Sequence, residues 1–193
     1  PLDDPGEQVN NYLEQTKYTY HSTDLPAVVD IEMYPSYLRD QYLSLSLAER
    51  KSRLQTWLDI VEAATGKKPI IYTNQYSWET LYSDTDDFTG YPLWIANYGT
   101  SSPNMPVDGD WGGNGWLFWQ YTNTGAVLGI NNGNPPVDID WYNGNLTSLH
   151  NLTGFSTDRS LPPLITNAAM VEGFRQAGVY LDIPTNSLIN QAG

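Results

Sequence analysis

One stretch, Leu25-Pro-Ala-Val-Val-Asp-Ile-Glu32, constrains the fold more than any other part of the chain. Its apolar residues Ala27, Val28, Val29 and Ile31 are typical of a strand buried on both faces, as in a parallel sheet covered by helices. Asp30 and Glu32 interrupt the end of that run, and residues two apart on a strand point to the same side. Two carboxylates held together there cost free energy unless one stays protonated or a substrate uses them. The pattern therefore indicates acid/base chemistry of the kind that cleaves a glycosidic bond.

Strand-like segments recur along the chain and alternate with helical or turn-rich ones. Strands are predicted at 27–31, 69–73, 91–98, 116–121 and 137–141. Helices are predicted at 6–20, 44–65, 76–82 and 144–152, and a long functional loop at 99–115. This rhythm predicts an α/β barrel whose functional residues follow the strands at their carboxyl ends. The polar and aromatic residues that fit this rule are Asp30, Glu32, Tyr72, Asn74, Asn97, Tyr98, Gln120, Tyr121 and Asp138.

Composition excludes several classes of partner and site. A net charge of −13 argues against a nucleic acid or an anionic membrane as partner, and no apolar run reaches membrane-spanning length. The absence of cysteine excludes disulfides and thiolate metal sites, while His21 and His150 are too isolated to predict a metal site. The 7 Trp and 14 Tyr against 4 Phe suit stacking on sugar rings, although most of these aromatic residues are expected in the core.

Several separate motifs resemble one enzyme family. They are Val28-Val-Asp-Ile-Glu32, Gly66-Lys-Lys-Pro-Ile-Ile-Tyr-Thr73, Pro92-Leu-Trp-Ile-Ala-Asn-Tyr98, Trp119-Gln-Tyr121 and Val137-Asp138. Their order and spacing, over about residues 1–150, are similar to those of glycoside hydrolase family 25, the Chalaropsis-type lysozymes or N-acetylmuramidases. The resemblance implies hydrolysis of the β-1,4 bond between N-acetylmuramic acid and N-acetylglucosamine in peptidoglycan glycan strands. It implies no metal and no organic cofactor.

The resemblance also implies roles for individual residues. Glu32 matches the general acid/base, and Asp30 matches the acid that stabilises an oxazolinium-like intermediate formed by the substrate's own 2-acetamido group. Asp138 matches a further acid at the last strand, although Asp140 lies two residues on and shares its face. Trp94 and Trp119 also fit core packing. The residues assigned to binding or supporting substrate are Tyr72, Trp94, Asn97, Tyr98, Trp119, Gln120 and Tyr121.

The chain departs from the family at its beginning. The family starts with a Gly-x-Asp-x-Ser strand and two further strand–helix units before Asp-x-Glu, and none of these is present. Residues 1–152 are therefore expected to form only the last five or so strands of an irregular TIM-like (β/α)5(β)3 barrel, with the outer edge of strand 27–31 unpaired. Three explanations stay open: a second chain that supplies the first strands, a sequence that is part of a longer protein, and a reduced, inactive derivative.

The remaining residues are predicted to form a linker at 153–163 and a small helical tail at 164–193, which packs on the barrel or serves wall binding or assembly. Two function classes follow from the whole sequence. One is a muramidase that is secreted, associated with the cell wall or encoded by a phage. The other is a non-catalytic glycan-binding or structural subunit derived from the same fold.

Overall fold

The computed structural model describes residues 3–16, 21–33, 35–127, 129–130 and 136–154. They belong to a compact unit that spans Pro1–Phe155. The predicted tail at 164–193 lies outside the described residues, as does all of the predicted linker after Gly154. In the part of the chain that is described, no helix combines the length and the apolar character needed to cross a bilayer.

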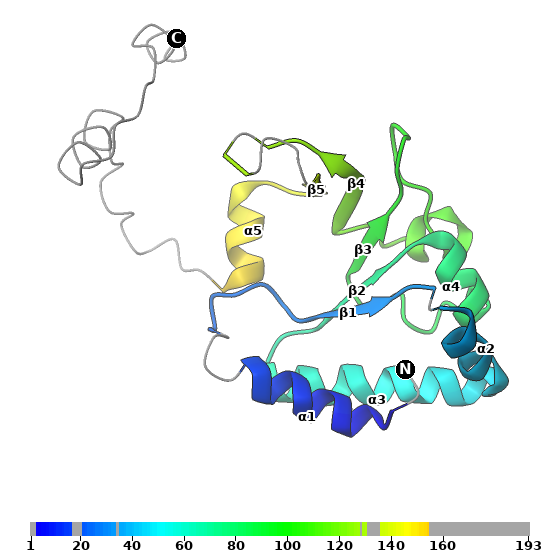
Figure 1. Cartoon of the computed structure of the whole chain (residues 1–193). Coiled ribbons are helices and arrows are strands. Elements are labelled where there is room, and N and C mark those ends of the chain that lie inside the picture. Colours follow the sequence, from blue (N-terminus) through cyan, green and yellow to red (C-terminus); the bar gives the residue numbers. More distant parts are fainter. Residues whose placement is uncertain (1–2, 17–20, 34, 128, 131–135, 155–193) are drawn as a thin grey trace, which may run out of the picture. The chain divides into compact units, whose positions relative to one another are not determined.

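A single five-stranded mixed sheet runs through the unit (Figure 1). Its strands follow one another in chain order, and neighbours are parallel except for the antiparallel last pair. The expectation of parallel strands is therefore wrong for the last strand, because the segment 126–136 that precedes it is shorter than the dozen or more residues that a parallel crossover needs. The strands are β1 (Val28–Ile31), β2 (Ile70–Thr73), β3 (Leu93–Ala96), β4 (Phe118–Gly125) and β5 (Val137–Tyr142).

These strands confirm the α/β class and all five predicted strand segments. The described residues form an open sheet, with β1 and β5 at its two edges, and not a closed barrel. The helices are α1 (Pro5–Thr16), α2 (Ser36–Ser44), α3 (Leu47–Thr65), α4 (Gln75–Tyr82) and α5 (Leu146–Thr153).

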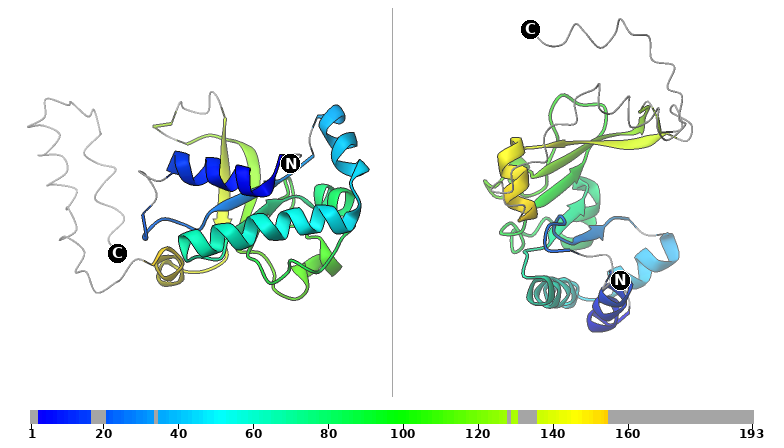
Figure 2. Two further views of the ribbon diagram at one scale, coloured as in Figure 1. Left: turned by 90° about the horizontal axis from the view of Figure 1, so that it is seen from below. Right: turned by 90° about the vertical axis from the view of Figure 1, so that its left-hand side faces the viewer.

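The helix predicted at 44–65 begins later, and a separate helix precedes it. Leu45 is extended, and the Ser46 side chain accepts a hydrogen bond from the Glu49 N–H, which starts α3. Gly66 ends α3 in the left-handed conformation, with φ of 70°. Helices α1 and α3 lie side by side on one face of the sheet, and the views in Figures 1 and 2 agree on this.

The core lies between these helices and the sheet. Ile71 of β2 and Ile95 of β3 are completely buried, as are Leu58 and Val61 of α3. Burial of such aliphatic side chains is the main source of the free energy of folding. The helix-covered face of the sheet is therefore the stabilising face.

The predicted long loop at 99–115 contains a tight turn, η1 (Val107–Trp111), whose backbone is not helical, since Val107, Asp108 and Trp111 have positive φ. The Trp111 side chain is fully buried, packs edge-to-face on Trp78 and donates its indole N–H to the Tyr91 carbonyl at 2.9 Å. The Val107 N–H donates to Asp84 Oδ1 at 2.8 Å. These contacts attach the end of the loop to the core.

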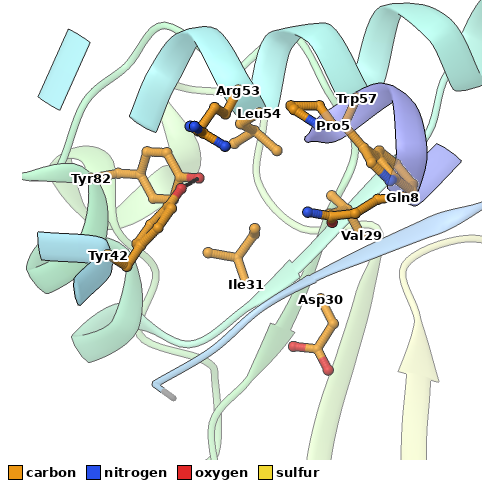
Figure 3. A pocket seen from close by; sticks show the side chains of 10 residues that line it. All are labelled: Pro5, Gln8, Val29, Asp30, Ile31, Tyr42, Arg53, Leu54, Trp57 and Tyr82. Atoms are coloured by element: carbon orange, nitrogen blue, oxygen red, sulfur yellow. Dashed lines mark hydrogen bonds between the residues drawn. The ribbon is translucent and has the colours of Figure 1, made fainter. Parts of the chain in front are cut away.

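A pocket lies beside β1 on the helix side of the sheet (Figure 3). Val29 and Ile31 point into it, whereas the Asp30 carboxylate points away from it, to the other side of β1. Adjacent residues of β1 therefore face two different environments. The pocket is lined by Pro5, Gln8, Val29, Asp30, Ile31, Tyr42, Arg53, Leu54, Trp57 and Tyr82.

Candidate active site

The face of the sheet away from the helices carries a row of aromatic side chains beside Asp30. The strand register pairs Asp30 with Tyr72, Tyr72 with Trp94, and Trp94 with Phe118. The Tyr72 and Trp94 rings meet edge-to-face at 5.5 Å between centroids, and the Trp94 and Phe118 rings are also 5.5 Å apart. The predicted residues Asp30, Tyr72 and Trp94 are thus brought onto one surface.

A polar row follows, nearer the carboxyl ends of the parallel strands. The Gln120 side chain is buried, and its Oε1 accepts hydrogen bonds from the hydroxyls of Tyr72 at 2.8 Å and Tyr98 at 2.5 Å. Tyr98 lies beyond β3 and joins the same surface through this contact. Burial is the first cause that raises the pKa of both tyrosines, so their hydroxyls stay protonated and act as donors.

Glu32 follows β1 directly and is half-buried. Its Oε1 accepts a hydrogen bond from Asn74 Nδ2 at 3.3 Å. Burial raises the pKa of Glu32, the charges of Asp30 and Asp138 raise it further, and the bond from Asn74 opposes them. Partial burial also raises the pKa of Asp30, although that side chain reaches solvent. Both shifts favour the protonated form of a carboxyl, which is the direction that a general acid requires.

The two acids of β5 differ in their partners. Trp94 donates its indole N–H to Asp140 Oδ1 at 2.7 Å. Burial raises the pKa of Asp140, the Trp94 bond lowers it and the charge of Asp138 raises it. Asp138 instead acts electrostatically on Glu32 and Tyr98. Of the two acids, Asp138 is the one whose charge acts on Glu32.

Three residues predicted to bind or support substrate have other surroundings. Trp119 is buried in the core on the other face of the sheet and donates its indole N–H to the Asn97 carbonyl at 2.7 Å. The Tyr121 ring packs against Trp119 and Trp141. Asn97 Oδ1 accepts from the Thr100 hydroxyl and the Asn104 N–H, both at 3.0 Å, and so orders the start of the following loop.

Asn74 is among the strand-end residues that the sequence singles out, but the sequence-based assignment gives it no role in catalysis or binding. The available signal is its position, since an Asn between a strand and a helix is a favoured helix N-cap whose amide group has a second end free to contact a neighbour. Among the described residues, no group of three or more His, Cys, Asp or Glu side chains is arranged to hold a metal ion.

Comparisons with known proteins agree on one family. The family model "Glycosyl hydrolases family 25" matches residues 2–130. The chain is 38% identical over 126 residues to the uncharacterized protein YegX of Escherichia coli strain K12, covering 65% of this chain and 39% of that protein. It is 32% identical over 130 residues to Lysozyme M1 of Streptomyces globisporus, covering 65% of this chain and 40% of that protein.

A solved structure supports the likeness of the fold. The crystal structure of the bacterial lysozyme from Streptomyces coelicolor aligns with a TM-score of 0.60 and 28% identity, over 70% of this chain and 59% of that one. The chain spans about two fifths of the length of the two curated relatives and about three fifths of the solved lysozyme.

Proposed function

We propose that this chain, which belongs to glycosyl hydrolases family 25, is part of a peptidoglycan hydrolase of the muramidase type. The observation that carries the proposal is the pair of carboxyl groups at the carboxyl end of β1. Asp30 points away from the helix side of the sheet (Figure 3), and the alternation of side chains puts Glu32 on the same side. Similarity to Lysozyme M1 supports the substrate class. The substrate bond is the β-1,4 linkage between N-acetylmuramic acid and N-acetylglucosamine, and the site of action is the cell wall.

The proposed mechanism gives the two acids different roles. Glu32 protonates the glycosidic oxygen as the bond to the anomeric carbon breaks, and the substrate's 2-acetamido oxygen forms a new bond to that carbon. Asp30, in its ionised form, stabilises the positive charge of the resulting oxazolinium ring. Glu32, now ionised, takes a proton from the water that opens the ring, which restores the starting state. The charge of Asp30 suits these two roles, because an ionised Asp30 raises the pKa of Glu32 and so helps Glu32 keep its proton.

The other residues of the open face support this chemistry. Asp138 is the proposed third acid, since its charge acts on Glu32. The hydroxyls of Tyr72 and Tyr98, which share the Gln120 oxygen, form a polar wall for sugar hydroxyls and acetamido groups. Trp94, oriented by its bond to Asp140, offers an aromatic surface for a sugar ring.

We further propose that strands from outside these residues pair with β1 to complete a barrel, either within a longer polypeptide or from a second chain. The Ile70 N–H donates to the Ala27 carbonyl at 2.8 Å, so alternate residues of β1 bond to β2. The backbone groups of Val28 and Asp30 then point to the outer edge, where the described residues supply no partner strand. An unpaired parallel strand of this kind is a site for strand addition.

Release of reducing sugar from purified peptidoglycan, measured with the strands that complete the barrel present, tests the function, with Glu32→Gln as the control. Glutamine keeps the size of the side chain but has no proton to donate, so we expect a loss of about 10²–10⁴-fold in rate. The open edge of β1 favours one alternative, a glycan-binding or structural subunit without catalysis. Equal rates for the two proteins, together with equal sedimentation with peptidoglycan, would support that alternative and refute the hydrolase.

A further inference from the structure

Asn74 connects the start of a helix to the acid pair. It directly follows β2 and is the N-cap of α4. Its Oδ1 accepts a hydrogen bond from the Ser77 N–H at 2.8 Å, and its Nδ2 donates to Glu32 Oε1 at 3.3 Å. One amide group therefore serves both α4 and Glu32.

The helix cap decides which end of the amide faces the acid. A reversed amide would direct its NH₂ group at the Ser77 N–H, donor against donor, and would direct its oxygen at the Glu32 carboxylate. Both contacts would be repulsive, and the first turn of α4 would lose its cap. The start of α4 thus fixes Nδ2 toward Glu32 before any substrate binds.

We propose that Asn74 is a positioning residue for Glu32: the first turn of α4 holds its amide so that Nδ2 orients the Glu32 carboxyl and favours its ionised form. The inference rests on the proposed role of Glu32 as the acid/base. A glycosidase of this type needs its acid in both forms, protonated to cleave the bond and ionised to activate water. Because the cap of α4 holds Asn74 Nδ2 in place, the Glu32 carboxylate takes the same orientation each time it loses its proton.

The contact from Asn74 acts on the pKa of Glu32 in the opposite direction from the other groups around it. Asp30 on β1 and Asp138 on β5 raise the pKa of Glu32 through their negative charges, in addition to the larger effect of burial. Tyr72 on β2 and Tyr98 beyond β3 also face it, as neutral hydroxyls. Within the described part of the chain, the Asn74 hydrogen bond is the influence that lowers this pKa.

Two substitutions separate the cap from the contact. Asn74→Ser keeps a favoured N-cap, because the serine hydroxyl accepts from the Ser77 N–H, but it removes the donor to Glu32. Asn74→Asp also keeps the cap and replaces the donor by a carboxylate oxygen. The chain offers a matched control in Asn145→Ser, because Asn145 caps α5 through a 2.9 Å bond from the Ser148 N–H. Asn145 follows β5, whose end pairs with the start of β4, so it lies at the opposite end of the sheet from Glu32.

The direct test is the titration of Glu32 in the full chain, followed by NMR of carboxyl-labelled glutamate, with Glu32→Gln identifying the signal. We expect the Glu32 pKa to rise in Asn74→Ser, to rise further in Asn74→Asp and to stay unchanged in Asn145→Ser. The alkaline limb of the pH–rate profile should move upward in the same order, because Glu32 keeps its proton longer. Thermal unfolding should change no more in Asn74→Ser than in Asn145→Ser.

An unchanged Glu32 titration in Asn74→Ser would overturn the inference, as would an equal shift in Asn145→Ser. A failure of the proposed function has a different result. All variants, including the unmodified protein, would then leave peptidoglycan intact, while the NMR titration would still decide whether Asn74 acts on Glu32.

Discussion

The two faces of the sheet are built from the same strands and differ in almost every physical property. On the helix side, Ile71 and Ile95 have 0% of their surface exposed and contact other apolar side chains. On the open side, Glu32 is half-buried and Asp30 and Asp140 are exposed, yet the surrounding protein desolvates each carboxyl enough to raise its pKa. Because side chains alternate along a strand, neighbours in sequence belong to opposite faces. One face stabilises the fold, and the other holds acids in an environment that opposes their ionisation.

This difference teaches where stability and activity are separable. A carboxylate that is hard to ionise destabilises the folded state near neutral pH, and the same property suits a proton donor. The hydrophobic face compensates for that cost. Substitutions on adjacent residues of one strand should therefore change one property and leave the other nearly unchanged.

The largest expected contrast is on β3, between Ile95 and its neighbour Trp94. Ile95→Ala removes a fully buried side chain and should lower the free energy of unfolding by about 2–5 kcal/mol. Trp94→Ala, on the open face, should cost less stability and reduce binding of glycan fragments instead. Urea denaturation and glycan titration of both variants provide the measurement. Equal losses of stability would break the distinction between the two faces.

The next contrast is within the open face, between the two acids of β5. Asp138→Asn removes the charge that acts on Glu32 and should reduce kcat by about 10²–10³-fold, as loss of a preorganised electrostatic group does. Asp140→Asn keeps an oxygen that can accept the Trp94 indole N–H, and should therefore reduce kcat much less. Hydrolysis of peptidoglycan by both variants decides between the two acids. A reversed order would give Asp140 the catalytic role.

A smaller effect is expected at the shared Gln120 oxygen. Tyr98→Phe removes one of the two hydroxyls that donate to it, and should cost about 0.5–1.5 kcal/mol in stability or in kcat/KM. The same change at Tyr91, which packs against the core, is the matched control and should leave kcat/KM unchanged. Steady-state kinetics and thermal unfolding of the two variants test this. A loss of kcat/KM in Tyr91→Phe alone would contradict the assignment of the polar wall to Tyr98.

Much of the fold is predictable because the strands have strong local signals. Apolar runs indicate all five strands, and the Ser46 cap and Gly66 indicate α3. Helix α2 has no such signal, since only Tyr42 is buried along it. The direction of β5 depends on the connection before it, and the sequence-based prediction of parallel strands does not consider that connection.

The site is predictable in part. Asp30 and Glu32 follow from the strand pattern, but the choice between Asp138 and Asp140 does not, because alternation places both on one face and only the register of the β4–β5 pair separates their contacts. For Trp119, the sequence alone is enough to decide which face of the sheet the side chain occupies. It is adjacent to Gln120, and two adjacent strand residues cannot share a face. Placing Gln120 among the acids already assigns Trp119 to the core.

The smallest expected effect concerns stability and pH. The folded-state pKa of Asp30 is raised above its value of 3.8 in the unfolded chain, so the folded state binds this proton more tightly. Stability should therefore fall as pH rises from that value through the raised one, and the loss is complete once the pH exceeds the raised pKa. Asp30→Asn abolishes this loss and should raise the melting temperature at pH 7, by at most about 4 °C because solvent reaches the carboxyl. Calorimetry between pH 4 and pH 8 should show the gain at the alkaline end only. A gain of equal size at pH 4 would indicate that packing changes caused it, and the open face would then carry no electrostatic strain to contrast with the core.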